Sequence, residues 1–277
     1  MTNIRVHSEL HYNIEQTSSF IFAVFAAGST YQTVVEERVT LEPSLPFERL
    51  PIDTDHHEIL RVTVEPGPFS LTYDATVRLD ARIANENPSR ETPFAELPAD
   101  VIGLLSPSRY CESDKLLRFV NRTFGTLSPG FERVTGICNW IYDHLTYIAG
   151  STDSSTTAVD VLVQAAGVCR DYAHLGIALC RAMGIPARYV SGYAVDLDPP
   201  DFHGFFEAYL DGRWYLFDAT RMAPIAKLVR IAAGRDAADA PFATFVGSAT
   251  LNSMVVSAID FAGVPADEMT TAPVTTA

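Results

Sequence analysis

The chain has 277 residues, of which 47% are hydrophobic and 19% charged, a balance typical of a globular protein of one or two domains. Lys and Arg number 20 against 34 Asp and Glu, and the net charge of −14 argues against nucleic acid and anionic membranes as partners. The longest early apolar run, residues 20–27, is too short to span a bilayer. It also follows a polar stretch, without the order of a charged and then an apolar segment that is typical of a secretory signal. We therefore expect a cytoplasmic protein.

Residues 3–80 show the alternation of apolar and polar side chains that is typical of β-strands. The predicted strands are 4–12, 20–25, 33–41, 59–64 and 70–79. Five strands without a helical period predict an N-terminal antiparallel β-sandwich-like domain over residues 1–92. Residues 84–100 contain several Asn and Pro residues and are expected to form a linker.

Residues 93–262 are expected to form a second, α+β domain. Helices are predicted over 115–124, 128–145, 158–166 and from residue 169 to a stop at 184–186. Strands are then predicted over 187–195, 203–210, 213–218, 228–232 and 254–259, with a hairpin turn at Asp211-Gly212. The last residues, 263–277, are rich in Thr, Ala and Pro and are expected to be disordered.

The cysteines and histidines give no pattern of a metal site. The four cysteines lack a close CxxC pair and are expected to be free thiols: Cys111, Cys138, Cys169 and Cys180. Four histidines of the N-terminal domain could form a metal cluster, but no Cys or carboxylate spacing completes a ligand set: His7, His11, His56 and His57. We expect surface histidines there, and neither a metal nor a cofactor.

Cys169 follows Gly167-Val168 and stands in the first turn of the predicted helix. Unpaired backbone N–H groups and the positive end of the helix dipole favour a thiolate at such a position. The same N–H groups can hold an oxyanion that develops on a substrate carbonyl. Taken alone, however, Cys169 is better interpreted as an ordinary small buried residue, because free cysteines are among the most buried residues.

A cysteine nucleophile needs a base and a group that orients the base. Residues that pair across the Asp211-Gly212 turn have numbers that sum near 423, and His203 with Asp218 sums to 421. These two side chains are therefore expected to lie nearly opposite each other. A helix start packed on this hairpin would bring Cys169 to His203.

Two other histidines are weaker candidates for the base. His174 lies five residues after Cys169, so about 100° per residue turns it roughly 140° away from the thiol. We interpret it as a packing or hydrogen-bonding residue of the helix. His144 lies beside Trp140, which is expected to be a core residue, and has no evident partner in the sequence.

Several motifs together resemble the bacterial transglutaminase-like superfamily of cysteine proteases. They are residues 167–175, 184–193, 201–203 and 214–220, with 107–110 and 234–236 as further matches. The resemblance implies a papain-like, transglutaminase-like catalytic domain over 93–262 and a catalytic triad of Cys169, His203 and Asp218. Two departures are Gly204-Phe205, where the family usually has a small residue and then Trp, and Ala219, where it usually has Pro.

The residues and the resemblance together predict cysteine-dependent acyl transfer from an amide, peptide or protein substrate. Water as acceptor gives a protease or amidase, and an amine gives a transglutaminase; the resemblance favours hydrolysis. A binding or scaffold protein that keeps the fold without turnover is the alternative. The second donor to the oxyanion is not evident, and Gln164 and Trp140 are its candidates.

Overall fold

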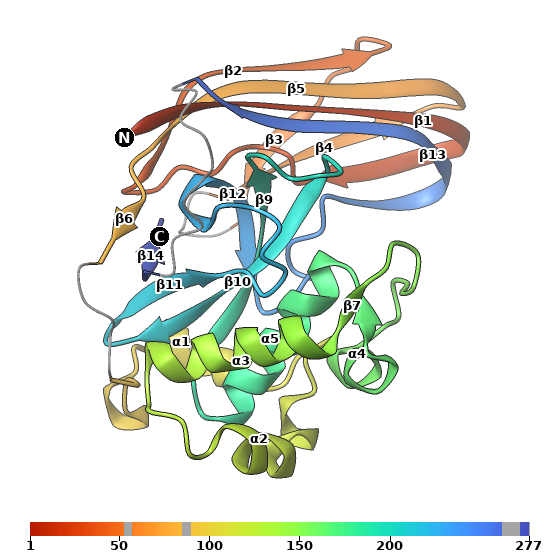
Figure 1. Cartoon of the computed structure of the whole chain (residues 1–277). Helices are drawn as coiled ribbons and strands as arrows, with labels where there is room; N and C mark the ends of the chain where they lie inside the picture. Colours follow the sequence, from red (N-terminus) through yellow and green to blue (C-terminus); the bar gives the residue numbers. More distant parts are fainter. Residues whose placement is uncertain (53–56, 85–89, 262–271, 277) are drawn as a thin grey trace.

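The computed structural model describes residues 1–52, 57–84, 90–261 and 272–276. Figure 1 shows a large β-sheet in the upper half of the molecule and a group of helices below a second, smaller sheet. The large sheet takes strands from both ends of the chain, because β1 (Thr2–Phe22) pairs with β13 (Ala243–Asp260). The smaller sheet and the helices contain the residues that the sequence predicts to be catalytic.

The large sheet is antiparallel and is organised around β1. Its remaining strands are β2 (Gln32–Glu42), β3 (Glu48–Pro51), β4 (Glu58–Val64) and β5 (Gly67–Leu79), in the order β2-β5-β1-β4-β3. Residues 2–14 of β1 pair with β5, and residues 18–22 pair with β4. The predicted strands 4–12 and 20–25 are therefore mostly parts of one long strand.

Alternate residues of β1 point into the core. Ile4, Val6 and Leu10 are buried, as the period of two in the sequence predicts. Further along the same face, the rings of Tyr12 and Phe20 meet edge to face with 5.1 Å between their centroids. Side chains from the two halves of β1 thus pack against each other, so one continuous sheet encloses the core of the β domain.

Strand β13 differs from the predicted organisation. We expected residues 243–260 to belong to the catalytic domain, with a short strand at 254–259. The structure has one 18-residue strand that pairs along β1, from Ile4 opposite Asp260 to Phe22 opposite Ala243. A local pattern cannot reveal this, because the partner strand lies more than 200 positions away in the sequence.

The C-terminal segment also corrects a prediction. β14 (Val274–Thr275) pairs antiparallel with β6 (Arg82–Ile83), and Val274 is fully buried against the unit that contains the predicted catalytic residues (the catalytic unit). The expected disorder is therefore wrong for residues 272–276. Residues 262–271 and 277 lie outside the described part of the chain.

The catalytic unit places a four-stranded antiparallel sheet against helices. The strands are β9 (Ala187–Ala194), β10 (Phe202–Leu210), β11 (Arg213–Phe217) and β12 (Leu228–Gly234), in the order β11-β10-β9-β12. The helices are α1 (Ala99–Ile102), α2 (Leu117–Phe124), α3 (Phe131–His144), α4 (Ala158–Gln164) and α5 (Cys169–Ala182). Short 3-10 turns are η1 (Phe94–Glu96), η2 (Gly103–Leu105), η3 (Ser113–Lys115) and η4 (Ile225–Lys227). A two-stranded parallel pair joins β7 (Thr146–Tyr147) to β8 (Ala166–Gly167).

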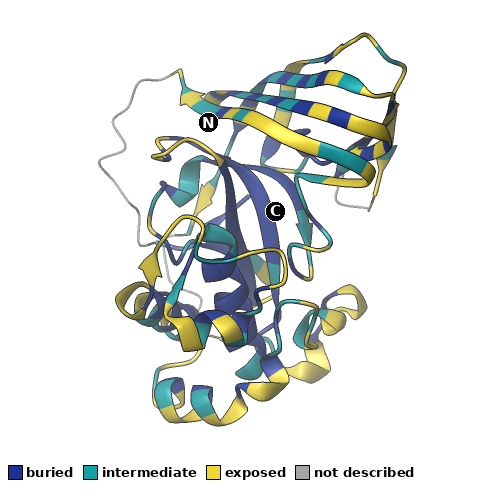
Figure 2. Cartoon of the chain, turned by 90° about the vertical axis from the view of Figure 1, so that its right-hand side faces the viewer, coloured by how far each residue is buried: buried dark blue, intermediate teal, exposed yellow. Residues whose placement is uncertain are grey.

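Helix α5 is the central helix of this unit. Every residue from Asp171 to Arg181 is buried. The central strands below the large sheet are buried as well, and they are coloured dark blue in Figure 2. A Cβ at Gly176 would come within 2.6 Å of the Phe206 ring. Helix α5 therefore lies directly on β10, closer than most side chains would permit.

The two units are joined by buried polar contacts. The Gln32 side chain donates to the backbone oxygen of Arg230 at 2.9 Å and accepts from its N–H at 2.9 Å. The Tyr193 hydroxyl donates to the Val24 oxygen at 2.6 Å. In the predicted linker, Glu91 accepts from Arg133 Nη1 at 2.6 Å, so this part of the segment is held against the catalytic unit. Residues 85–89 are outside the described ranges.

The expected surface histidines have different environments. His7 and His11 lie on the outer face of β1 and contact Asp74 and Glu9, respectively. His57 is only 1% exposed, which corrects the surface prediction, and His56 is outside the described residues. Within the described ranges, no group of three or more His, Cys, Asp and Glu side chains could hold a metal ion.

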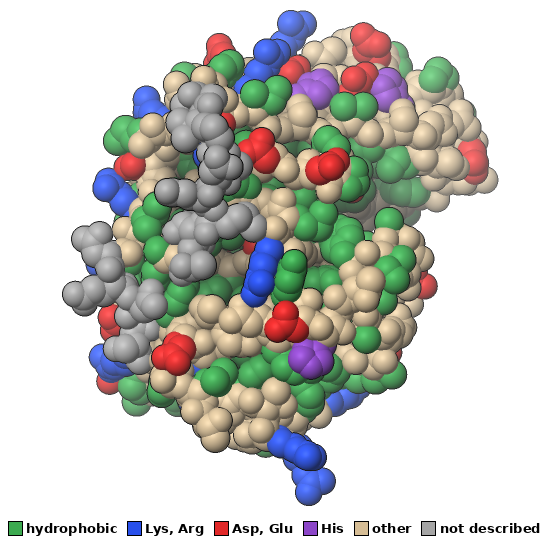
Figure 3. All heavy atoms as spheres, in the orientation of Figure 1, with side chains coloured by type: hydrophobic (Ala, Val, Ile, Leu, Met, Phe, Trp, Pro, Cys, Tyr) green, Lys and Arg blue, Asp and Glu red, His purple; other side chains and the backbone are tan. Residues whose placement is uncertain are grey.

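Charged side chains are scattered over the face of the molecule shown in Figure 3, where acidic and basic groups alternate with apolar ones. Among the described residues, no helix is both long enough and apolar enough to cross a membrane.

Candidate active site

Cys169 begins α5, as predicted. Val168 before it is extended, with φ −116° and ψ −178°, and helical geometry starts at the cysteine. The Cys169 side chain is partly exposed, whereas Cys111, Cys138 and Cys180 are buried. The thiol is therefore both accessible to solvent and close to the N–H groups of a helix start.

A buried carboxylate fixes the first turn of α5. Asp171 is fully buried, and its Oδ2 accepts from the Val168 N–H at 2.9 Å and from the Thr152 hydroxyl at 2.5 Å. Its Oδ1 accepts from Arg170 Nη2 at 3.0 Å. Because both oxygens are engaged, the residues on either side of Cys169 are held in place.

The approach of α5 to β10 depends on a glycine next to His203. A Cβ at Gly204 would lie 2.5 Å from the Tyr189 hydroxyl and 3.2 Å from the Arg170 Cα. A larger residue would push the first turn of α5 away from the strand. Gly204 thus permits the approach of Cys169 to His203. The following residue, Phe205, places its ring 6.3 Å from the His203 ring, where the family usually has Trp.

His203 and Asp218 meet, as the numbering of the hairpin predicts. The ladder of β10 and β11 runs from Leu210 opposite Arg213 to Phe206 opposite Phe217, where the numbers sum to 423. Both polar residues lie past the last pair, and His203 Nε2 is 2.7 Å from Asp218 Oδ2. Their side chains are 1% and 2% exposed.

Asp218 is held as an ionised acceptor. Its Oδ1 accepts from the Thr220 N–H at 2.9 Å and from the Thr220 hydroxyl at 2.7 Å. Burial alone would raise the pKa of Asp218, but the charge of His203 and the hydrogen bonds from His203 and Thr220 bring it below the usual value. Because a carboxylate can only accept, it fixes the imidazole proton on Nε2.

The other nitrogen of His203 is left for the thiol. Nδ1 has no hydrogen-bond partner among the described residues, and the Cys169 side chain acts on the ring electrostatically. Burial would lower the pKa of His203, but Asp218 and then Cys169 raise it to about 10. The imidazolium is therefore favoured beside the thiol, and Nδ1 is the atom that can exchange a proton with sulfur.

His174 is bound elsewhere, as its helical position predicts. Its Nε2 accepts from the Ala237 N–H at 3.1 Å, and its ring stacks on Tyr110 with 5.0 Å between centroids. Burial is the main cause that lowers the pKa of His174 to about 3, so the ring is neutral. His174 packs the helix against neighbouring segments.

The two predicted donors to an oxyanion have other surroundings. Trp140 stacks on His144 with 4.1 Å between ring centroids and packs edge to face on Phe119 at 5.2 Å. It belongs to the packing of α2 on α3, as expected for a core residue. Gln164 is exposed at the end of α4.

Tyr147 is a residue near the thiol that the sequence analysis missed. It pairs with Gly167 in the parallel ladder of β7 and β8, and its side chain interacts with Cys169. The strand β7 has only two residues, which is too short for a periodic signal.

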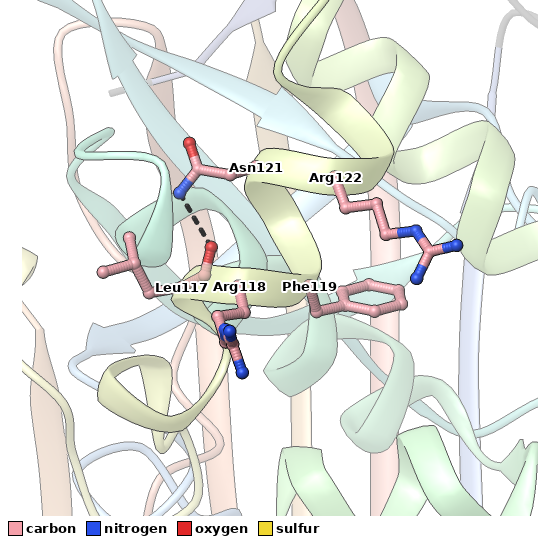
Figure 4. Close-up of a pocket in the computed structure, with 5 residues that line it drawn as sticks. All are labelled: Leu117, Arg118, Phe119, Asn121 and Arg122. Carbon is pink, nitrogen blue, oxygen red and sulfur yellow. Dashed lines mark hydrogen bonds between the residues drawn. The ribbon is translucent and has the colours of Figure 1, made fainter.

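A hollow on the surface of α2 is separate from these residues. Figure 4 shows its lining, which is Leu117, Arg118, Phe119, Asn121 and Arg122. Asn121 Nδ2 donates to the Leu117 oxygen at 2.8 Å. All five side chains come from one helix, and none belongs to the predicted triad.

Comparisons with known proteins identify the family and the fold of this chain. Residues 118–219 match the transglutaminase-like superfamily, and residues 2–100 match the bacterial transglutaminase N-terminal domain. A solved structure of a candidate cysteine protease from Cytophaga hutchinsonii is 41% identical, with a TM-score of 0.90, over 94% of this chain and 91% of that chain.

Two mycobacterial relatives are also similar. An uncharacterized protein of Mycobacterium leprae is 28% identical over 253 residues, which cover 84% of this chain and 88% of that protein. An uncharacterized protein of Mycobacterium tuberculosis is 29% identical over 206 residues, which cover 70% of this chain and 65% of that protein.

The predicted fold is confirmed, since helices and antiparallel sheets combine as they do in the transglutaminase-like fold. The matched core contains Cys169, His203 and Asp218, and the matched N-terminal domain covers β1 to β5. The chain belongs to the transglutaminase-like superfamily.

Proposed function

We propose that this protein transfers an acyl group from an amide or peptide bond through a thioester on Cys169, and that water is the usual acceptor. The observation that carries the proposal is the position of the His203 ring. Its Nε2 is bound to Asp218 at 2.7 Å, and its other nitrogen is left to exchange a proton with the partly exposed thiol. The similar protein of Cytophaga hutchinsonii, a candidate cysteine protease, supports hydrolysis.

In the first half of the reaction, the Cys169 thiolate attacks the amide carbon and the carbonyl electron pair moves to oxygen. The His203 imidazolium then donates the Nδ1 proton to the leaving nitrogen, and the C–N bond breaks. In the second half, the neutral imidazole takes a proton from water, which attacks the thioester and releases the acid. Asp218 stays ionised throughout and holds the ring.

The proposal is tested with intact-protein mass spectrometry on a panel of blocked glutaminyl amides, isopeptides and simple peptides. We expect at least one substrate to add its acyl mass to Cys169, with the adduct absent from Cys169→Ala. Repeating the reaction with a primary amine separates the acceptors, since hydrolysis gives the acid and transfer gives the new amide. A protein that binds panel members but never forms the thioester would act as a binding or scaffold protein.

A further inference from the structure

Acyl transfer at Cys169 requires a place for the negative charge that develops on the carbonyl oxygen. The Cys169 backbone N–H, at the start of α5, is one donor for that oxygen. A second donor has to come from another element close to the same N–H. The sequence offers two candidates for this donor. Trp140 packs between α2 and α3, and Gln164 lies exposed at the end of α4.

Strand β7 brings Tyr147 to this position. The parallel ladder places Tyr147 opposite Gly167, two residues before Cys169, and the Ile148 N–H donates to the Gly167 oxygen at 3.0 Å. The Tyr147 ring contacts the ring of Tyr172, a residue in the first turn of α5, with 5.9 Å between the centroids. Two residues of β-pairing thus fix the ring beside the helix start.

The pairing with Gly167 and the contact with the Tyr172 ring place the Tyr147 side chain at the start of α5, where the side chain and the backbone of Cys169 both act on its phenol. Burial, and then the charge of Cys169, raise the pKa of Tyr147 far above its usual value, so the phenol keeps its proton. Tyr147 is also 39% exposed, which leaves its ring open to an incoming substrate. A protonated phenol beside the thiol and the helix N–H has the chemistry of an oxyanion donor.

We propose that Tyr147 is a catalytic residue whose hydroxyl, together with the Cys169 backbone N–H, donates a hydrogen bond to the oxyanion. The inference rests on the proposed acyl transfer and adds the second donor to it. In the free protein the hydroxyl lies against Cys169. In the tetrahedral intermediate the substrate oxygen accepts from both groups, and the phenol proton stays on Tyr147.

The test compares two reactions of the same thiol. With 4-nitrophenyl acetate, the Cys169 sulfur bonds to the carbonyl carbon, an oxyanion forms, and 4-nitrophenolate leaves as the carbonyl is restored. With iodoacetamide, sulfur displaces iodide at a saturated carbon and no oxyanion forms. Loss of an oxyanion donor therefore slows the first reaction only.

Tyr147→Phe is expected to lower the rate of acetyl thioester formation at Cys169 by about 10²–10³-fold. Its rate of alkylation by iodoacetamide should stay close to that of the wild type. The matched control is Tyr172→Phe, which removes a phenol hydroxyl from the neighbouring ring, whose centroid is 5.9 Å from that of Tyr147. This control should change neither rate appreciably. Both rates are followed by peptide mapping.

Three results would overturn the inference. If Tyr147→Phe acylates as fast as the wild type or faster, the hydroxyl is not a donor. If acylation and alkylation fall equally, Tyr147 acts on the thiol itself. If the wild type alkylates at Cys169 but forms no acetyl thioester there, the proposed function fails and the inference fails with it.

Discussion

The His203→Ala variant is expected to turn over amides at least about 10²–10⁴-fold more slowly than the wild type, the usual contribution of general acid–base catalysis. His203 serves both half-reactions, since it protonates the leaving amine and later deprotonates water. His174 cannot replace it, because His174 is buried and its Nε2 is bound to the Ala237 N–H. The measurement is the turnover of the panel substrate that the wild type hydrolyses fastest.

His174→Ala is the matched control for this variant, because it removes the other histidine of the catalytic unit's core. It should lower the melting temperature, since it leaves a cavity beside Tyr110 and Tyr189. The folded fraction should keep its turnover. If His174→Ala abolishes turnover at unchanged stability while His203→Ala remains active, the base has been assigned to the wrong histidine.

The Asp218→Asn variant is expected to fold normally and to lose about 10⁴-fold in turnover, as in the serine-protease triad. The asparagine oxygen can still accept from the Thr220 N–H and hydroxyl, which bind Oδ1 in the wild type. Its NH₂ group would then face His203 Nε2 and donate to it. The imidazole proton would move to Nδ1 and face the thiol, so the neutral ring could no longer accept a proton there.

The decisive comparison for Asp218→Asn is turnover against melting temperature. A large loss of turnover with little change in melting temperature supports an orienting role. Turnover within about tenfold of the wild type would show that the carboxylate is not needed to hold the ring. Thr220→Val is a useful control, because it removes the hydroxyl that donates to Oδ1 at 2.7 Å but leaves His203 Nε2 bound to Asp218.

Local sequence patterns predicted the elements that carry the triad. The apolar run after Cys169 predicted α5, and the Asp211-Gly212 turn predicted the β10–β11 hairpin and its register. Each of these rests on contacts between residues close in sequence, which periodicity and turn chemistry report directly. The meeting of His203 with Asp218 could be predicted for the same reason.

Contacts between distant segments could not be predicted. β13 joins the N-terminal sheet through pairing with β1, and Val274 is buried against the catalytic unit, although the sequence around it is rich in Thr, Ala and Pro. Tyr147 was missed because its position depends on a two-residue parallel pairing with Gly167. The role of Gly204 was hidden as well, since the close approach of Arg170 becomes visible only in the packed structure.

Competitive alkylation of the four cysteines tests the central claim most directly, which is that Cys169 is the nucleophile. Burial raises the pKa of Cys111 to about 12 and raises the pKa of Cys138 and of Cys180 well above its usual value, so these thiols are both shielded and protonated at neutral pH. Cys169 is partly exposed at a helix start beside His203. With limiting iodoacetamide at neutral pH and peptide mapping of the folded protein, we predict that Cys169 is labelled before the other three. Labelling of Cys111, Cys138 or Cys180 ahead of Cys169 would contradict the assignment of the nucleophile and, with it, the proposed reaction.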